Sequence, residues 1–183
     1  NSGSGSRLVV SNGAVVANTT GYLGTNAFAS NNLALITGAG SLWTNSGALN
    51  VGPSGSGNQL VVSNGATVVN TAGTLGDQSS SSNNAAVVTG SGSLWRNSGD
   101  LTVGNISSAN LLTVTNGAAV ANNLYLGRNG GGNNRLIISA GTVVVTNGSF
   151  IGGLGSNNLI VVTGAGSLWT NGNFISMGIE GSG

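Results

Sequence analysis

The sequence has no cysteine, no histidine and a single proline, and only 4% of its 183 residues are charged. Without cysteine the chain can form neither disulfide bonds nor thiolate metal sites, so packing must hold its fold. The four cations are scattered arginines and the net charge is +1. Because no basic block is present to bind a phosphate backbone, we expect no nucleic-acid partner.

Long hydrophobic runs are also missing. The longest, such as 159–162, contain four residues, whereas a membrane span needs about 20 and a signal-peptide core about 7–15. We therefore expect that this segment does not insert into a membrane. It is expected to be soluble or already processed, as a mature fragment or an excerpt of a longer protein.

The residues that usually perform catalysis are scarce. Asp77, Asp100 and Glu180 are the only acidic residues, and no two share a repeat at a spacing that suggests an acid and base pair. The chain has no histidine, lysine or cysteine that could activate a nucleophile or act as one. The glycine-rich segment 130–132 carries no carboxylate that could bind calcium. We expect no enzyme, and no catalytic, cofactor or metal site.

The sequence is instead rich in glycine, with 34 residues, and 39% of it is hydrophobic. That hydrophobic share is enough for a core, so the polar residues do not indicate general disorder. An asparagine opens each apolar segment at a regular interval: the first four are spaced by 26 residues and the next two by 24. These are Asn32, Asn58, Asn84, Asn110, Asn134 and Asn158. With an earlier copy starting near Ser6, the sequence predicts seven repeats and one domain over 1–183.

Each repeat contains three short segments rich in valine, isoleucine, leucine and threonine, separated by Asn-Gly or glycine-rich turns, as in 60–63, 66–70 and 75–76. This pattern indicates strands. A unit of this size cannot bury its own apolar face, but stacked units bury a continuous core. The sequence therefore predicts an all-β fold, a parallel β-helix of about seven three-strand rungs that start near 6, 32, 58, 84, 110, 134 and 158.

Alignment of the repeats predicts three inward apolar columns. The first strand contributes Val10, Ile36, Val62, Val88, Val114, Ile138 and Val162. The second contributes Val16, Trp43, Val68, Trp95, Val120, Val144 and Trp169, and the third Leu23, Val51, Leu75, Val103, Leu126, Ile151 and Met177. Small residues two positions before the second column should also point inward: Ala14, Ser41, Ala66, Ser93, Ala118, Thr142 and Ser167.

Asparagine recurs at the end of the second strand, at positions 18, 45, 70, 97, 122 and 171, with Thr146 as the exception. Stacked side-chain amides can hydrogen-bond along the axis, so this column is predicted to form an asparagine ladder.

The segments 37–47, 89–99 and 163–172 share the motif Thr-Gly-Ala/Ser-Gly-Ser-Leu-Trp, and others share Leu-Val-Val-Ser-Asn-Gly-Ala. Together they resemble the passenger-associated repeats of bacterial autotransporter (type V secreted) proteins, over essentially the whole chain. The resemblance implies a right-handed β-helical passenger exported to the cell surface, as an adhesin or fibre. Extracellular or bacterial cell-surface localisation is therefore expected.

Outward positions indicate where partners could bind. On the first strand they form an apolar stripe of Val9, Leu35, Val61, Val87, Ile137 and Val161, interrupted by Thr113. The stripe predicts either lateral association or a face selected for strand propensity alone. On the third strand Tyr22, Tyr125 and Phe150 should face outward, where aromatic rings could contact a glycan or a host surface. Carbohydrate binding, polysaccharide processing and, as a minor alternative, ice binding therefore stay open.

Neither end of the chain shows a polar or helical cap, because normal repeats begin and finish within a few residues of it. We expect the molecule to be one segment of a longer axial assembly. Its partner would be the remainder of a longer passenger or further copies of itself, stacked end to end or side by side.

Overall fold

The computed structural model describes residues 3–178, and its regular structure over this range consists of strands only. Twenty-one strands form three parallel sheets of seven strands each. The first sheet contains β1 (Arg7–Ser11), β4 (Leu33–Thr37), β7 (Gln59–Ser63), β10 (Ala85–Thr89), β13 (Leu111–Thr115), β16 (Arg135–Ser139) and β19 (Leu159–Thr163). No helix long and apolar enough to cross a membrane occurs within 3–178.

The second sheet contains β2 (Val15–Asn18), β5 (Leu42–Asn45), β8 (Thr67–Asn70), β11 (Leu94–Asn97), β14 (Ala118–Ala121), β17 (Thr142–Val145) and β20 (Leu168–Asn171). The third contains β3 (Gly21–Leu23), β6 (Leu49–Val51), β9 (Gly73–Leu75), β12 (Leu101–Val103), β15 (Leu124–Leu126), β18 (Gly148–Ile151) and β21 (Phe174–Met177). Three consecutive strands make one turn of a solenoid, from rung 1 (β1–β3) to rung 7 (β19–β21).

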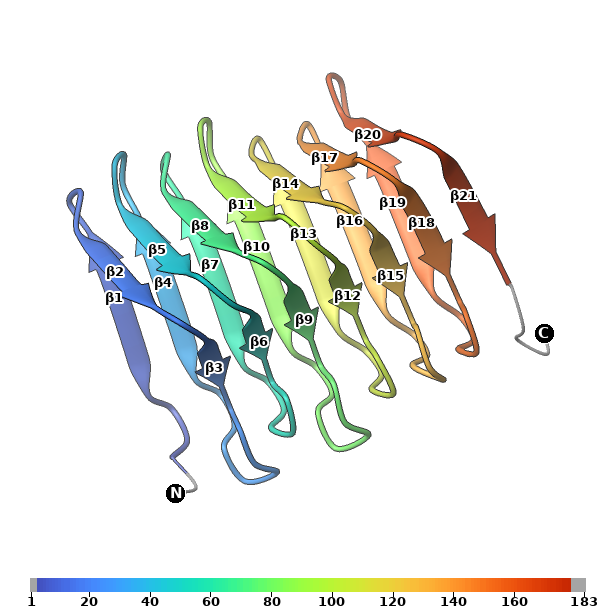
Figure 1. The fold of residues 1–183 in the computed structure, drawn as a ribbon, viewed down its shortest axis with the longest axis horizontal. Helices are drawn as coiled ribbons and strands as arrows, with labels where there is room; N and C mark the ends of the chain where they lie inside the picture. The colour runs from blue at the N-terminus through green and yellow to red at the C-terminus, as the bar shows by residue number, and fades with distance from the viewer. Residues whose placement is uncertain (1–2, 179–183) are drawn as a thin grey trace.

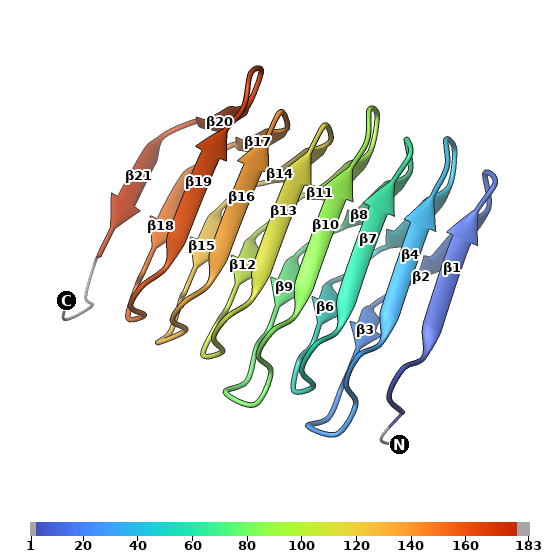
Figure 2. The same cartoon turned by 180° about the vertical axis from the view of Figure 1, so that it is seen from behind.

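The coil is right-handed. In Figure 1 the chain runs upward along the first sheet at the back and downward along the third sheet at the front while it advances from left to right. Figure 2 shows the same course from behind, with the first sheet nearest the viewer. The predicted parallel β-helix with seven three-strand rungs is therefore confirmed.

The core is a single column of apolar side chains between the three sheets. The predicted first and third columns are confirmed, since every member in rungs 1 to 6 is buried. In rung 7 the corresponding Val162 and Met177 are 45% and 73% exposed, because no further described rung covers them. Trp95 is fully buried and Trp43 nearly so, which confirms their inward prediction.

The second column is wrong by one residue in rungs 5 and 6. Ala119 and Val143 point inward, in register with Trp95 and Trp169, whereas Val120 and Val144 point outward. The cause is the turn that joins the first and second sheets, which has three residues in rung 3 but two in rungs 5 and 6. A shift of one residue moves a strand's side chains to the opposite face.

The same shift affects the two neighbouring columns. The small inward residues of rungs 5 and 6 are Gly117 and Gly141, and not Ala118 and Thr142. The second-strand asparagine column is likewise interrupted, because Ala121 and Val145 occupy the inward position predicted for residues 122 and 146. The ladder is also broken between Asn45 and Asn70, because the buried Asn45 Nδ2 has no hydrogen-bond partner. Two separate asparagine pairs remain, Asn18 with Asn45 and Asn70 with Asn97.

Candidate interaction surfaces

The corner between the third and first sheets holds a continuous, largely buried asparagine ladder. Its members are Asn32, Asn58, Asn84, Asn110, Asn134 and Asn158, the residues that mark the repeat. In each link the side-chain amide and the backbone N–H of one asparagine both donate to the Oδ1 of the next. For Asn58 and Asn84 the two distances are 3.2 and 2.8 Å. Sequence reasoning found these asparagines as repeat markers but missed this function.

The ladder also fixes the loops that leave the third sheet. Asn84 Nδ2 donates to Ser81 O at 2.8 Å, and Asn58 Nδ2 donates to Ala29 O at 3.2 Å. A glycine with positive φ follows each third-sheet strand, and the five after β3, β6, β9, β12 and β15 pack against this ladder. A Cβ on Gly52, whose φ is 69°, would lie 2.2 Å from Asn84 Nδ2. The loops beyond these glycines protrude at one corner, at the bottom of Figure 1.

The two described carboxylates belong to smaller, outer ladders. Asp77 accepts the side-chain amide of Asn105 at 2.7 Å, and Asn105 in turn accepts that of Asn129 at 2.7 Å. Asp100 accepts the amide of Asn123 at 2.9 Å. Glu180, the third predicted isolated carboxylate, lies outside the described residues. Within 3–178 no three His, Cys, Asp or Glu side chains gather in a way that could hold a metal ion.

The predicted apolar stripe faces outward along the whole first sheet. Its members pair in register from rung to rung, Val9 with Leu35 and then Leu35 with Val61, up to Ile137 with Val161. Val9 is 51% exposed and the other members are half-buried. The outward orientation is confirmed, whereas the lateral partner stays a prediction.

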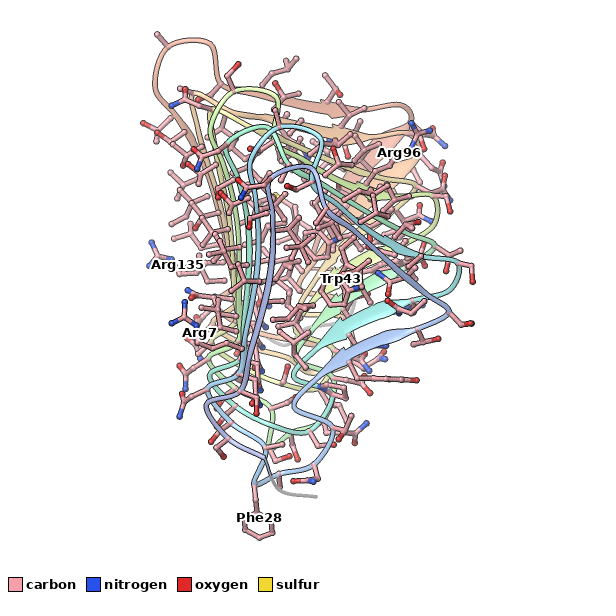
Figure 3. All side chains as sticks on the ribbon, turned by 90° about the vertical axis from the view of Figure 1, so that its left-hand side faces the viewer. Arg7, Phe28, Trp43, Arg96 and Arg135 are labelled. Carbon is pink, nitrogen blue, oxygen red and sulfur yellow. The ribbon has the colours of Figure 1, made fainter. Side chains whose placement is uncertain are left out.

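The columns that flank this stripe differ: one is polar throughout, and the other is mixed, with Arg7, Gln59 and Arg135 among Leu33, Ala85, Leu111 and Leu159. On one side Arg7 and Arg135 extend away from the sheet, as Figure 3 shows. On the other side every rung places a hydroxyl: Ser11, Thr37, Ser63, Thr89, Thr115, Ser139 and Thr163. Sequence analysis missed this hydroxyl column because serine and threonine are also common turn residues, and the column ends each strand.

The three predicted outward aromatic residues do not form one site. Tyr125 and Phe150 stack with ring centroids 4.8 Å apart and planes at 6°. The guanidinium of Arg128 lies 4.2 Å from the Tyr125 centroid, and Phe174 meets Phe150 edge-on at 5.0 Å. Tyr22 lies four rungs away and is 58% exposed.

This packing matters for glycan binding, because a sugar stacks on an aromatic face. Phe150 and Arg128 both lie against the Tyr125 ring, which leaves its edge as the more accessible part. Tyr22 keeps a more accessible ring, and Phe28, at the tip of the loop that follows β3, is 78% exposed (Figure 3). Carbohydrate contact at the three predicted residues stays a prediction, with Tyr22 as its most accessible member.

The N-terminal end of the solenoid is hollow. A cavity of about 410 Å³ opens there, and its apolar lining includes Leu8, Leu23, Ala34 and Trp43. Figure 3 looks toward this end and shows Trp43 between the sheets. The C-terminal end presents exposed apolar side chains instead, among them Ile175 at 50%.

No known protein family, curated protein or solved structure matches this chain in the comparisons made with each. The chain is therefore described by its architecture, a β-solenoid of seven rungs.

Proposed function

We propose that this chain is an extracellular structural segment, a stiff axial stalk of a bacterial surface protein, with an adhesive role through its sides. The observation that carries the proposal is the uninterrupted stack: three parallel sheets extend over all seven rungs, and a ladder of six corner asparagines extends over rungs 2 to 7 and is joined to rung 1 by the Ser6 backbone N–H. Because every rung is bonded to the next at four places around the coil, bending would have to distort sheets and ladder together. Seven rungs at about 4.8 Å give a rod of roughly 34 Å.

Extracellular location is part of this proposal and is supported by the resemblance of the repeats to autotransporter passengers. Antibodies raised against the chain should label intact cells of its source, and external protease should remove that signal. An internal cytoplasmic protein serves as the integrity control. Labelling that requires permeabilised cells would refute the location.

The adhesive part of the proposal rests on the apolar stripe of the first sheet, an outward face interrupted by Thr113 and flanked on one side by the hydroxyl column. Replacing Val61 and Val87 with arginine should reduce side-by-side bundles in electron micrographs. The first sheet already carries outward arginines at 7 and 135, so the fold should tolerate the change. The matched control, Val69→Arg with Val144→Arg, places the same added charge on the outward side of the second sheet. If both variants form bundles to the same extent, the apolar stripe is not the adhesive surface.

A further inference from the structure

Rungs 1 to 4 are of two kinds, and they pack as ordered pairs. In rungs 2 and 4 an inward tryptophan donates its indole N–H to an asparagine of the preceding rung: Trp43 to Asn18 at 2.8 Å, and Trp95 to Asn70 at 2.9 Å. Each indole also lies over a glycine of that preceding rung. A Cβ on Gly21 or Gly73 would lie 2.8 Å from the indole Cζ2. A plain rung followed by a tryptophan rung is therefore one packing unit.

Rung 1 repeats rung 3 at the inward positions of its strands and their flanks, whereas the corner residue differs, Ser6 in rung 1 and the buried Asn58 in rung 3. Both carry Leu, Val, Ala, Val, Asn, Gly and Leu: residues 8, 10, 14, 16, 18, 21 and 23 in rung 1, and 60, 62, 66, 68, 70, 73 and 75 in rung 3. The rung packed before rung 3 is the tryptophan rung 2, and the rung before rung 5 is the tryptophan rung 4. The N-terminal face of rung 1 is thus shaped for a tryptophan rung.

The chain contains such a rung at its other end. Rung 7 carries Trp169 at the position of Trp43, and its inward Val162, Ile175 and Met177 are 45%, 50% and 73% exposed. Their counterparts in rung 2 are Ile36, Leu49 and Val51, all completely buried against rung 3. The apolar side chains exposed at the C-terminal end therefore occupy the same positions as the rung 2 side chains that pack on rung 3. The cavity at the N-terminal end lies on the corresponding side of rung 1.

We propose that the N-terminal face of rung 1 binds the C-terminal face of rung 7 of a second copy of this chain. Strands β19, β20 and β21 of one molecule then pair in parallel with β1, β2 and β3 of the next, in the register that joins rung 2 to rung 3. In the first sheet this register sets Val161 of one copy beside Val9 of the other. This proposal rests on the proposed structural role and specifies its axial partner.

Disulfide cross-linking tests the register directly, because the chain has no cysteine of its own. In a Val9→Cys, Val161→Cys variant the two thiols would face each other across adjacent strands at a separation that a disulfide can bridge. Within one molecule they are six rungs, or about 29 Å, apart, so they cannot join internally. Oxidation should produce a ladder of dimers, trimers and larger species on a non-reducing gel. Either single variant has no second thiol at the contact and should remain largely monomeric. Val15→Cys with Val161→Cys, which lie on different sheets, should give few multimers.

A charge at the contact provides an independent test. Met177→Glu, added to the cysteine pair, alters a side chain that is largely exposed in the single molecule but would be buried in the contact. It should lower the cross-linked multimers by more than about tenfold, because burying an unpaired charge is strongly unfavourable. Ile106→Glu, on an exposed loop in the middle of the rod, is the matched control and should leave them unchanged.

Absence of multimers from the in-register pair, or equal amounts from the out-of-register pair, would overturn the proposal. So would a Met177→Glu variant that cross-links like its parent. Circular dichroism and small-angle scattering on the same samples distinguish a failure of the end-to-end proposal from a failure of the proposed stalk function. A folded, rod-shaped monomer without cross-links refutes end-to-end binding alone, whereas loss of surface labelling refutes the stalk's location alone.

Discussion

The buried corner ladder should contribute strongly to stability, and Asn84→Ala tests it at its centre. Asn84 is fully buried. Its Oδ1 accepts the backbone N–H of Asn58 at 2.8 Å and the Asn58 amide at 3.2 Å, and its own amide donates to Ser81 O and Asn110 Oδ1. Alanine removes all four hydrogen bonds.

The expected loss follows from the groups left without partners. Asn58 Nδ2 retains Ala29 O and Ser56 O, but the Asn58 backbone N–H and the Ser81 carbonyl each lose the partner that Asn84 supplied. A buried polar group left unsatisfied costs about 1–3 kcal/mol. Two such groups predict a loss of about 2–6 kcal/mol in the free energy of unfolding.

Asn129→Ala is the matched control, because Asn129 also belongs to an axial ladder but is exposed. Its loss should be below about 0.5 kcal/mol, as is usual for surface positions. Urea unfolding, monitored by circular dichroism, measures the free energy of unfolding of both variants. Because a solenoid can unfold in parts, amide hydrogen exchange of the loops 53–57 and 77–83 should accompany it. An Asn84→Ala loss below about 1 kcal/mol, or equal to that of Asn129→Ala, would refute the reasoning.

Three further predictions concern single side chains. Trp95→Ala should lower stability by about 3–5 kcal/mol through lost burial and a cavity, measured by urea unfolding; near-native stability would contradict its fully buried position. Ala109 has φ 59°, so Ala109→Gly should remove the strain of a left-handed alanine and raise the free energy of unfolding by about 0.5–1 kcal/mol. The thermal midpoint should rise accordingly, and a lower midpoint would contradict this. Val145→Asn should supply an acceptor to the buried, unpartnered indole N–H of Trp169 and add about 1 kcal/mol, whereas a loss would show that the amide cannot reach it.

The fold could be predicted from the sequence because its constraints recur. The predicted inward columns of the first and third strands contain only aliphatic residues in rungs 1 to 6, and glycine or asparagine with positive φ marks most of the turns. The second strand failed in rungs 5 and 6 because alternation is ambiguous there. Residues 143–145 are three consecutive valines, so hydrophobicity does not distinguish the inward face, and the length of the preceding turn decides it.

The interaction surfaces were less predictable because they depend on contacts between rungs. The outward orientation of Tyr125 and Phe150 follows from alternation, but the stacking of their rings and the position of Arg128 do not. Similarly, the spacing of the corner asparagines is visible in the sequence. Their burial depends on the glycine column and on loops whose course the spacing does not determine.

The corner ladder also determines which ends of the solenoid can meet. Every link has the same direction: the N–H groups of one rung donate to the Oδ1 of the next, beginning with the Ser6 N–H and Asn32. Ser6 occupies the asparagine position in rung 1, so its hydroxyl would replace Oδ1 as the acceptor on the N-terminal face, and a rung added there must bring donors, as the C-terminal face of another copy would. Contact between two N-terminal faces, or between two C-terminal faces, would set acceptors against acceptors or donors against donors at this corner. It would also require antiparallel strand pairing, whereas all three sheets are parallel. A symmetric end-to-end dimer is thus disfavoured, and contact between unlike ends continues into an open filament.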